Sequence, residues 1–129
     1  MKYKLTDLQL SGNKQIQDAK ALLDLLNEHH HTSIQMTFTR ACGGKANLML
    51  QKFTIPKHAL DKGDTYLQYY VIHEFTHCLG HFCKHDKSFK CQERYLLNLF
   101  GMSIDYARAY PIALYVSGEK VYQKKGVQQ

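Results

Sequence analysis

Residues 73–77 read His73-Glu74-Phe75-Thr76-His77, and the largely apolar residues 66–72 before them predict a buried helix. On a helix, residues four apart are separated by about 400° of rotation and about 6 Å of rise. The imidazoles of His73 and His77 therefore project from one face and converge on one point. Glu74 follows at about 100° around the helix, close enough to hold a water molecule beside that point. This arrangement predicts a metal site in which Glu74 acts as general base.

A catalytic zinc site needs a third protein ligand and one open position. On a straight helix His81 would stand about 6 Å beyond His77, out of reach of a zinc–nitrogen bond of about 2.0–2.1 Å. The helix is expected to end at Gly80, because glycine readily adopts the left-handed conformation common at helix ends. We predict His85 as the third ligand, because it starts a segment that Phe89 could anchor in the core. The sequence leaves three alternatives open: His81, Cys83 and Glu93.

The rest of the chain predicts an α+β fold. Apolar residues at three- and four-residue intervals predict an N-terminal helix over residues 13–30. Alternation over residues 34–40 and a second strand over residues 47–55 predict a small, mainly antiparallel sheet before the helix that carries His73. A further helix is expected over residues 88–100, and a hairpin over residues 112–122 around a Gly-containing turn. The expected buried face of the further helix is Phe89, Tyr95, Leu96, Leu99 and Phe100.

Length and composition predict one compact domain over residues 1–129, because the chain is long enough to bury a core and 44% of it is hydrophobic. The formal net charge is +6, and the basic residues concentrate near both ends and between Lys84 and Arg94. We interpret this excess as solvated surface and keep contact with DNA as an alternative. The expected substrate partner is a protein or peptide.

The expected compartment is the cytoplasm. The first residues show no apolar run typical of a signal peptide, and no stretch approaches the roughly 20 apolar residues of a spanning helix, so no membrane contact is expected. In a reducing compartment, cysteines are expected as free thiols or metal ligands rather than in disulfides. This prediction applies to Cys42, Cys78, Cys83 and Cys91. Small buried residues are the preferred interpretation for the last three.

The pattern resembles the SprT-like and related small zincin metallopeptidases, whose HExxH helix is followed by a third histidine in a short H-G/S-x-x-F/W segment. Here that segment is His85-Asp86-Lys87-Ser88-Phe89, and residues 44–60 are similar to the strand before the active helix in that group. Two departures are Asp86, where the family usually has a small residue, and a spacing from His77 to His85 that is shorter than in many members. The metzincin pattern HExxHxxGxxH is also similar, but its third histidine falls at Cys83.

The resemblance implies a zincin-like minimal domain with Zn²⁺ on His73, His77 and His85. It implies a zinc metallopeptidase in which Glu74 activates a zinc-bound water for attack on a peptide carbonyl, and SprT-like relatives also act on protein bound to DNA. A polar-aromatic stretch near the C-terminus offers candidates for a second donor to the developing oxyanion, and surface or hairpin packing explains these residues at least as well: Tyr106, Arg108 and Tyr110.

Two other functions compete with the peptidase. Metal-dependent endoribonucleases of the rRNA-maturation type resemble HGxxHxxGxDH, and Glu74 argues against them because glycine stands at that position in their pattern. The other competitor is a non-catalytic, zinc-stabilised binding or regulatory module. A closed four-ligand site, for example with Cys83 added to the histidines, would favour such a module because no position stays open for water.

Overall fold

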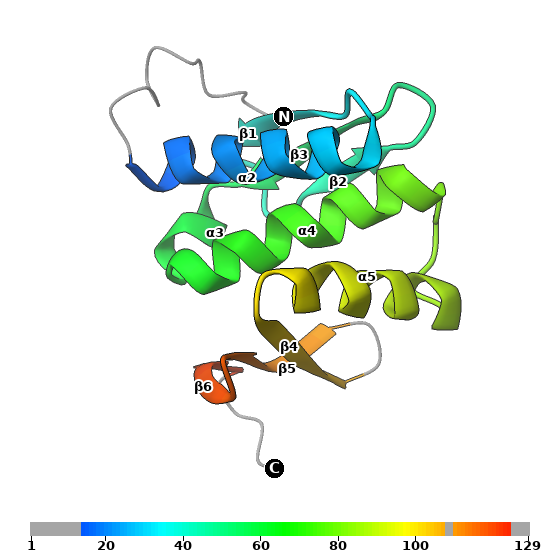
Figure 1. The fold of residues 1–129 in the computed structure, drawn as a ribbon. Helices are drawn as coiled ribbons and strands as arrows, with labels where there is room; N and C mark the ends of the chain where they lie inside the picture. Colours follow the sequence, from blue (N-terminus) through cyan, green and yellow to red (C-terminus); the bar gives the residue numbers. More distant parts are fainter. Residues whose placement is uncertain (1–13, 108–109, 125–129) are drawn as a thin grey trace. The chain divides into compact units, whose positions relative to one another are not determined.

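The computed structural model describes residues 14–107 and 110–124 (Figure 1). It divides into two compact units, Met1–Cys83 and Lys84–Gln129. The predicted α+β class is confirmed, with an N-terminal helix, a small sheet, further helices and a C-terminal sheet. None of the helices in the described ranges combines the length and apolar character that a membrane-spanning helix requires.

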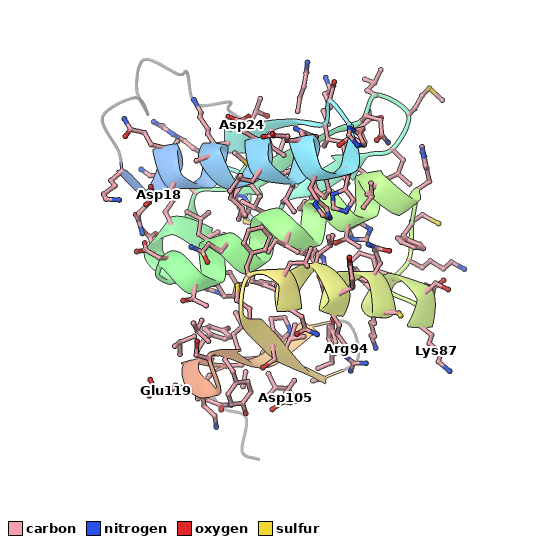
Figure 2. The ribbon with its side chains drawn as sticks, viewed as in Figure 1. Asp18, Asp24, Lys87, Arg94, Asp105 and Glu119 are labelled. Carbon is pink, nitrogen blue, oxygen red and sulfur yellow. The ribbon has the colours of Figure 1, made fainter. Side chains whose placement is uncertain are left out.

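The first unit begins with helix α2, Lys14–His30, as the apolar periodicity predicts. Its apolar residues recur at three- and four-residue spacing and so share one face. This face is buried, and consists of Ile16, Ala19, Leu22, Leu23 and Leu26. The acidic side chains of Asp18 and Asp24 are exposed and extend from the same helix (Figure 2).

The first sheet contains β1, Gln35–Thr39, β2, Lys45–Asn47, and β3, Lys52–Pro56, in the order β1-β3-β2. The sequence predicts a mainly antiparallel sheet, but β1 pairs with β3 in parallel and only β2 is antiparallel to β3. The predicted single strand over residues 47–55 is also wrong, because a turn divides it. In that turn Asn47 Oδ1 accepts the Leu50 N–H at 2.9 Å, and Gln51 has a left-handed φ of 53°.

Two helices follow the sheet: α3, His58–Asp61, which the sequence did not predict, and α4, Asp64–Gly80. The predicted end of α4 at Gly80 is confirmed, but the left-handed residue is His81, with a φ of 54°. Glycine is needed at position 80 for a different reason. A Cβ there would overlap the Phe82 ring, which folds back over the end of the helix.

The second unit begins with α5, Lys87–Leu99, whose N-cap is Asp86. The Asp86 side chain accepts the Phe89 N–H at 3.0 Å, which satisfies one of the helix's unpaired donors. The predicted buried face is partly wrong, because Tyr95, Leu99 and Phe100 are 53%, 48% and 36% exposed. The observed buried residues are Phe89, Glu93, Leu96 and Leu97, which follow the helical spacing i, i+4, i+7, i+8.

The C-terminal sheet is antiparallel, in the order β4-β5-β6. The predicted hairpin is confirmed as β5, Tyr110–Val116, and β6, Glu119–Gln123. Its turn residues, Ser117 and Gly118, both have positive φ (51° and 84°), as a tight two-residue hairpin requires. The third strand, β4, Met102–Ala107, was not predicted and extends the hairpin into a sheet.

Candidate metal centre

Three histidines that the sequence singles out lie together. The ligand atoms of His73, His77 and His85 are all within 4.8 Å of one another, so this group could hold a metal ion. Helix α4 supplies the first two, whose ring centroids are 5.0 Å apart with planes at 83°. Tetrahedral zinc with bonds of about 2.1 Å separates its nitrogen ligands by roughly 3.4 Å. The separations in the histidine group exceed this value by at most about 1.4 Å.

His77 is held in one tautomer by the backbone that follows α4. Its Nδ1 lies 2.7 Å from the Phe82 carbonyl oxygen, which can only accept, so Nδ1 carries the proton and donates. In this tautomer of the neutral ring, the lone pair that a metal ion would use is on Nε2. The side chain is only 8% exposed, so packing also fixes its direction. This is the type of outer contact that orients histidine ligands in metal sites.

His73 has a comparable contact within its own helix. The Tyr69 hydroxyl lies 3.2 Å from His73 Nδ1, and the two ring centroids are 5.5 Å apart. If Nε2 binds a metal, Nδ1 of the neutral ring carries the proton, and its N–H donates a hydrogen bond to the Tyr69 oxygen. Tyr69 is 3% exposed, so this partner is fixed in the core. The sequence carried a signal for it, because residues four apart on a helix are neighbours.

Tyr69→Phe is expected to weaken the binding of a metal ion, measured with Zn²⁺ as the probe, about 10- to 100-fold, because the ring stays packed while the hydroxyl that orients His73 is lost. Competition with a chelating dye measures the affinity. Tyr95→Phe, which removes a hydroxyl from an exposed side chain on α5, serves as the matched control. Equal zinc affinities in the two variants would show that Tyr69 does not support His73.

His85 lies in the loop of residues 81–86 and packs edge-on against the Phe89 ring, with centroids 5.1 Å apart and planes at 90°. Phe89 is 1% exposed, so the prediction that it anchors this turn in the core is confirmed. Asp86, which differs from the small residue usual in the SprT-like pattern, is the N-cap of α5. The cap and the buried ring together restrict where His85 can point.

Glu74 is 5% exposed and follows His73 on α4. Burial and, as the smaller cause, the negative charge of Glu74 raise the pKa of the Cys78 thiol to about 11. Burial also raises the pKa of Tyr70, a hydrogen bond from Gly44 opposes this shift, and the charge of Glu74 adds to it. The Glu74 carboxylate is therefore within electrostatic range of both residues, in surroundings with little water to screen it.

The metal group does not include the alternative third ligands His81, Cys83 or Glu93. His81 and Cys83 are exposed, and His81 serves as the C-cap of α4. Glu93 is fully buried and accepts the Tyr106 hydroxyl at 2.5 Å. Burial, then the charge of Glu93 and this hydrogen bond, raise the pKa of Tyr106 far above its usual value. The Tyr106 hydroxyl thus donates its hydrogen bond to Glu93, while Arg108 and the Tyr110 side chain lie outside the described residues.

All four cysteines are free, as predicted. Cys78 is buried as expected, and its raised pKa keeps the thiol protonated at neutral pH, which makes it unreactive. The prediction that Cys83 and Cys91 are small buried residues is wrong, because both are exposed. Cys83 lies in the loop after α4, and Cys91 lies on the solvent side of α5.

Part of the basic excess is engaged within the second unit. Lys90 Nζ and Arg94 Cζ lie 5.2 and 5.0 Å from the centroid of the Tyr106 ring, a cation–π arrangement. Lys87 and Arg94 are exposed side chains of the same helix (Figure 2). Helix α5 therefore presents positive charge to solvent. Its one acidic residue, Glu93, is buried, so the exposed surface of the helix carries no carboxylate.

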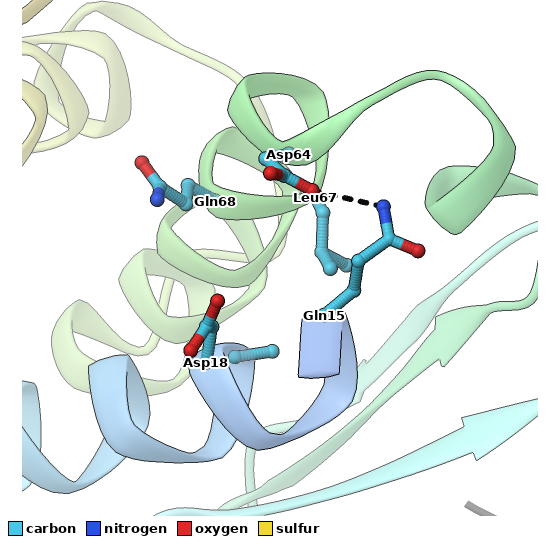
Figure 3. A pocket seen from close by; sticks show the side chains of 6 residues that line it. Gln15, Asp18, Asp64, Leu67 and Gln68 are labelled. Atoms are coloured by element: carbon cyan, nitrogen blue, oxygen red, sulfur yellow. Dashed lines mark hydrogen bonds between the residues drawn. The ribbon is translucent and has the colours of Figure 1, made fainter. Parts of the chain in front are cut away.

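A small hollow of about 40 Å³ lies beside the first turn of α4, where Gln15 Nε2 donates to Asp64 Oδ1 at 2.9 Å (Figure 3). Its volume is close to that of one water molecule. Asp64 precedes His73 by nine residues, or roughly 14 Å along the helix. The hollow is therefore separate from the histidine group. It is lined by Gln15, Asp18, Ala19, Asp64, Leu67 and Gln68.

The chain matches no family model, no curated protein and no solved structure. The chemical features of the site are three imidazoles whose ligand atoms lie within 4.8 Å of one another and a buried carboxylate, Glu74, on the helix that carries His73 and His77.

Proposed function

We propose that this protein is a zinc-dependent metallopeptidase of the SprT-like type. In this proposal Zn²⁺ binds His73, His77 and His85, and Glu74 is the catalytic base. The observation that carries the proposal is the group of three histidine ligand atoms within 4.8 Å, next to a buried glutamate. Three neutral nitrogen donors suit zinc, and three protein ligands leave a fourth position for water, as catalytic zinc sites do.

In the proposed reaction the histidines hold the zinc ion and Glu74 transfers the proton. A bound zinc ion supplies Lewis acidity and lowers the pKa of water from about 15.7 toward about 7. Glu74 accepts a proton from the water that attacks the peptide carbonyl carbon, and returns it to the leaving amine nitrogen as the C–N bond breaks. Water is thereby divided between the new carboxylate and the new amine. The hydrogen bonds from His77 to Phe82 and between His73 and Tyr69 keep the imidazoles oriented throughout.

The proposed substrate is a protein or peptide, and the proposed compartment is the cytoplasm. DNA is a proposed additional partner, which would contact the exposed cations Lys87 and Arg94 of α5. Charge complementarity with phosphates supports this contact, and it predicts a strong dependence on salt concentration.

The test combines metal analysis with turnover. The protein is purified without added metal, and zinc is measured by elemental mass spectrometry. Cleavage of an unfolded protein such as casein is followed with and without double-stranded DNA, before and after chelation. The proposal predicts about one zinc per chain and cleavage that chelation abolishes and zinc restores.

Other results would assign other functions. Cleavage of RNA with no cleavage of protein would favour the endoribonuclease. Bound zinc without turnover, together with loss of the folded circular dichroism spectrum after chelation, would favour a structural zinc in a binding module.

A further inference from the structure

Tyr70 is a residue that the sequence interpretation did not use. It precedes Glu74 by one turn of α4 and is partly exposed. The Gly44 N–H donates to its hydroxyl oxygen at 2.8 Å. Among the described residues this is the only hydrogen bond of the Tyr70 hydroxyl, so its own proton is left to donate. Tyr106 differs, because its proton is engaged by Glu93.

The backbone at Gly44 holds this hydroxyl in place. A Cβ at position 44 would lie 2.5 Å from the Thr54 carbonyl oxygen and 2.7 Å from Tyr70 Cε1. Only glycine allows the main chain to approach the tyrosine this closely. The hydroxyl oxygen therefore accepts a hydrogen bond from a fixed backbone N–H, and this polarises its O–H bond and makes it a better donor.

The position of Tyr70 on α4 places it beside the proposed chemistry. Residues four apart on a helix differ by about 40° in direction and about 6 Å in height, so Tyr70 and Glu74 share a side of the helix. The charge of Glu74 acts on the Tyr70 hydroxyl, and the Tyr70 ring centroid lies 6.2 Å from that of His73. A polarised donor thus lies next to the base and next to one of the proposed zinc ligands.

We propose that the Tyr70 hydroxyl is a second catalytic group, which donates a hydrogen bond to the substrate carbonyl oxygen as negative charge develops there. The inference rests on the proposed peptidase function and adds the oxyanion donor that function requires. The donor is held in advance by Gly44, so its orientation costs little when substrate binds. No proton is transferred, because the hydroxyl stays intact and only its hydrogen bond strengthens in the transition state.

Tyr70→Phe is the direct test. A donor that acts only in the transition state predicts a kcat about 100-fold lower with KM and zinc content unchanged. It also predicts that a phosphonamidate inhibitor, which mimics the tetrahedral state, loses affinity by a similar factor. Tyr95→Phe, on an exposed position of α5, is the matched control. A residue that only supports the fold would lower the melting temperature without changing inhibitor affinity relative to KM.

A kcat in Tyr70→Phe within about threefold of wild type would overturn the inference while leaving the peptidase intact. If that variant does not fold, Gly44→Ala decides, because it keeps the hydroxyl but displaces it and is expected to lower kcat. Normal turnover in a folded Gly44→Ala would contradict the role. Absence of peptide hydrolysis in the wild type would overturn both proposals, and normal turnover in Glu74→Gln would overturn the proposed role of Glu74.

Discussion

Glu74→Gln is expected to lose nearly all peptide hydrolysis while keeping its metal. The amide has the size of the carboxylate, so packing at this 5% exposed position is preserved, but the amide cannot accept a proton from water. General base catalysis contributes about 100- to 10,000-fold, and kcat should fall by a factor in that range. Steady-state cleavage of a fluorogenic peptide measures the loss, and elemental mass spectrometry measures the zinc.

Glu28→Gln makes the same chemical change at an exposed position on α2 and should behave as wild type. Two results would contradict the proposed role of Glu74. Turnover within a few-fold of wild type would show that the carboxylate is not the base, and loss of zinc together with turnover would show that Glu74 supports the metal instead.

The helical part of the site was predictable because it depends only on local periodicity. Positions 73 and 77 are four apart in a buried helical stretch, and this spacing alone places two imidazoles on one face. The position of His85 was predictable from a weaker signal, the downstream Phe89 that anchors its loop. The polar contacts around the imidazoles were harder to predict. The Phe82 carbonyl that fixes His77 belongs to the backbone. Every residue type has such a group, so the sequence does not indicate which one His77 contacts.

The parts of the fold that were predicted wrongly depend on contacts between segments that are distant in the sequence. The parallel alignment of β1 with β3 is not visible in strand patterns, because the alternation of residues is the same in either direction. The buried face of α5 was misassigned because large apolar residues were taken as buried. Glu93 takes a core position instead, with Tyr106 as its hydrogen-bond donor. Its partner lies on β4, a strand that the sequence did not predict.

Alanine at any one of His73, His77 or His85 is expected to release most of the zinc. Structural zinc in small peptide sites binds with about 10–16 kcal/mol, so an equal share among four ligands gives roughly 3–4 kcal/mol each, or a few-hundred-fold in affinity. Zinc per chain after dialysis against a weak chelator measures this loss. His77→Ala should also lower stability toward urea, because this side chain is 8% exposed and bonded to the Phe82 carbonyl.

His81→Ala and Cys83→Ala are the matched controls, because both side chains are close to His85 in sequence, exposed, and outside the histidine group. They should retain about one zinc per chain. Full retention in His85→Ala with loss in Cys83→Ala would reassign the third ligand to the cysteine, whose exposed thiol is accessible to a metal. Loss in Glu93→Gln alone would reassign it to the glutamate and would require Tyr106 to give up its present acceptor. The group of His73, His77 and His85 predicts neither result.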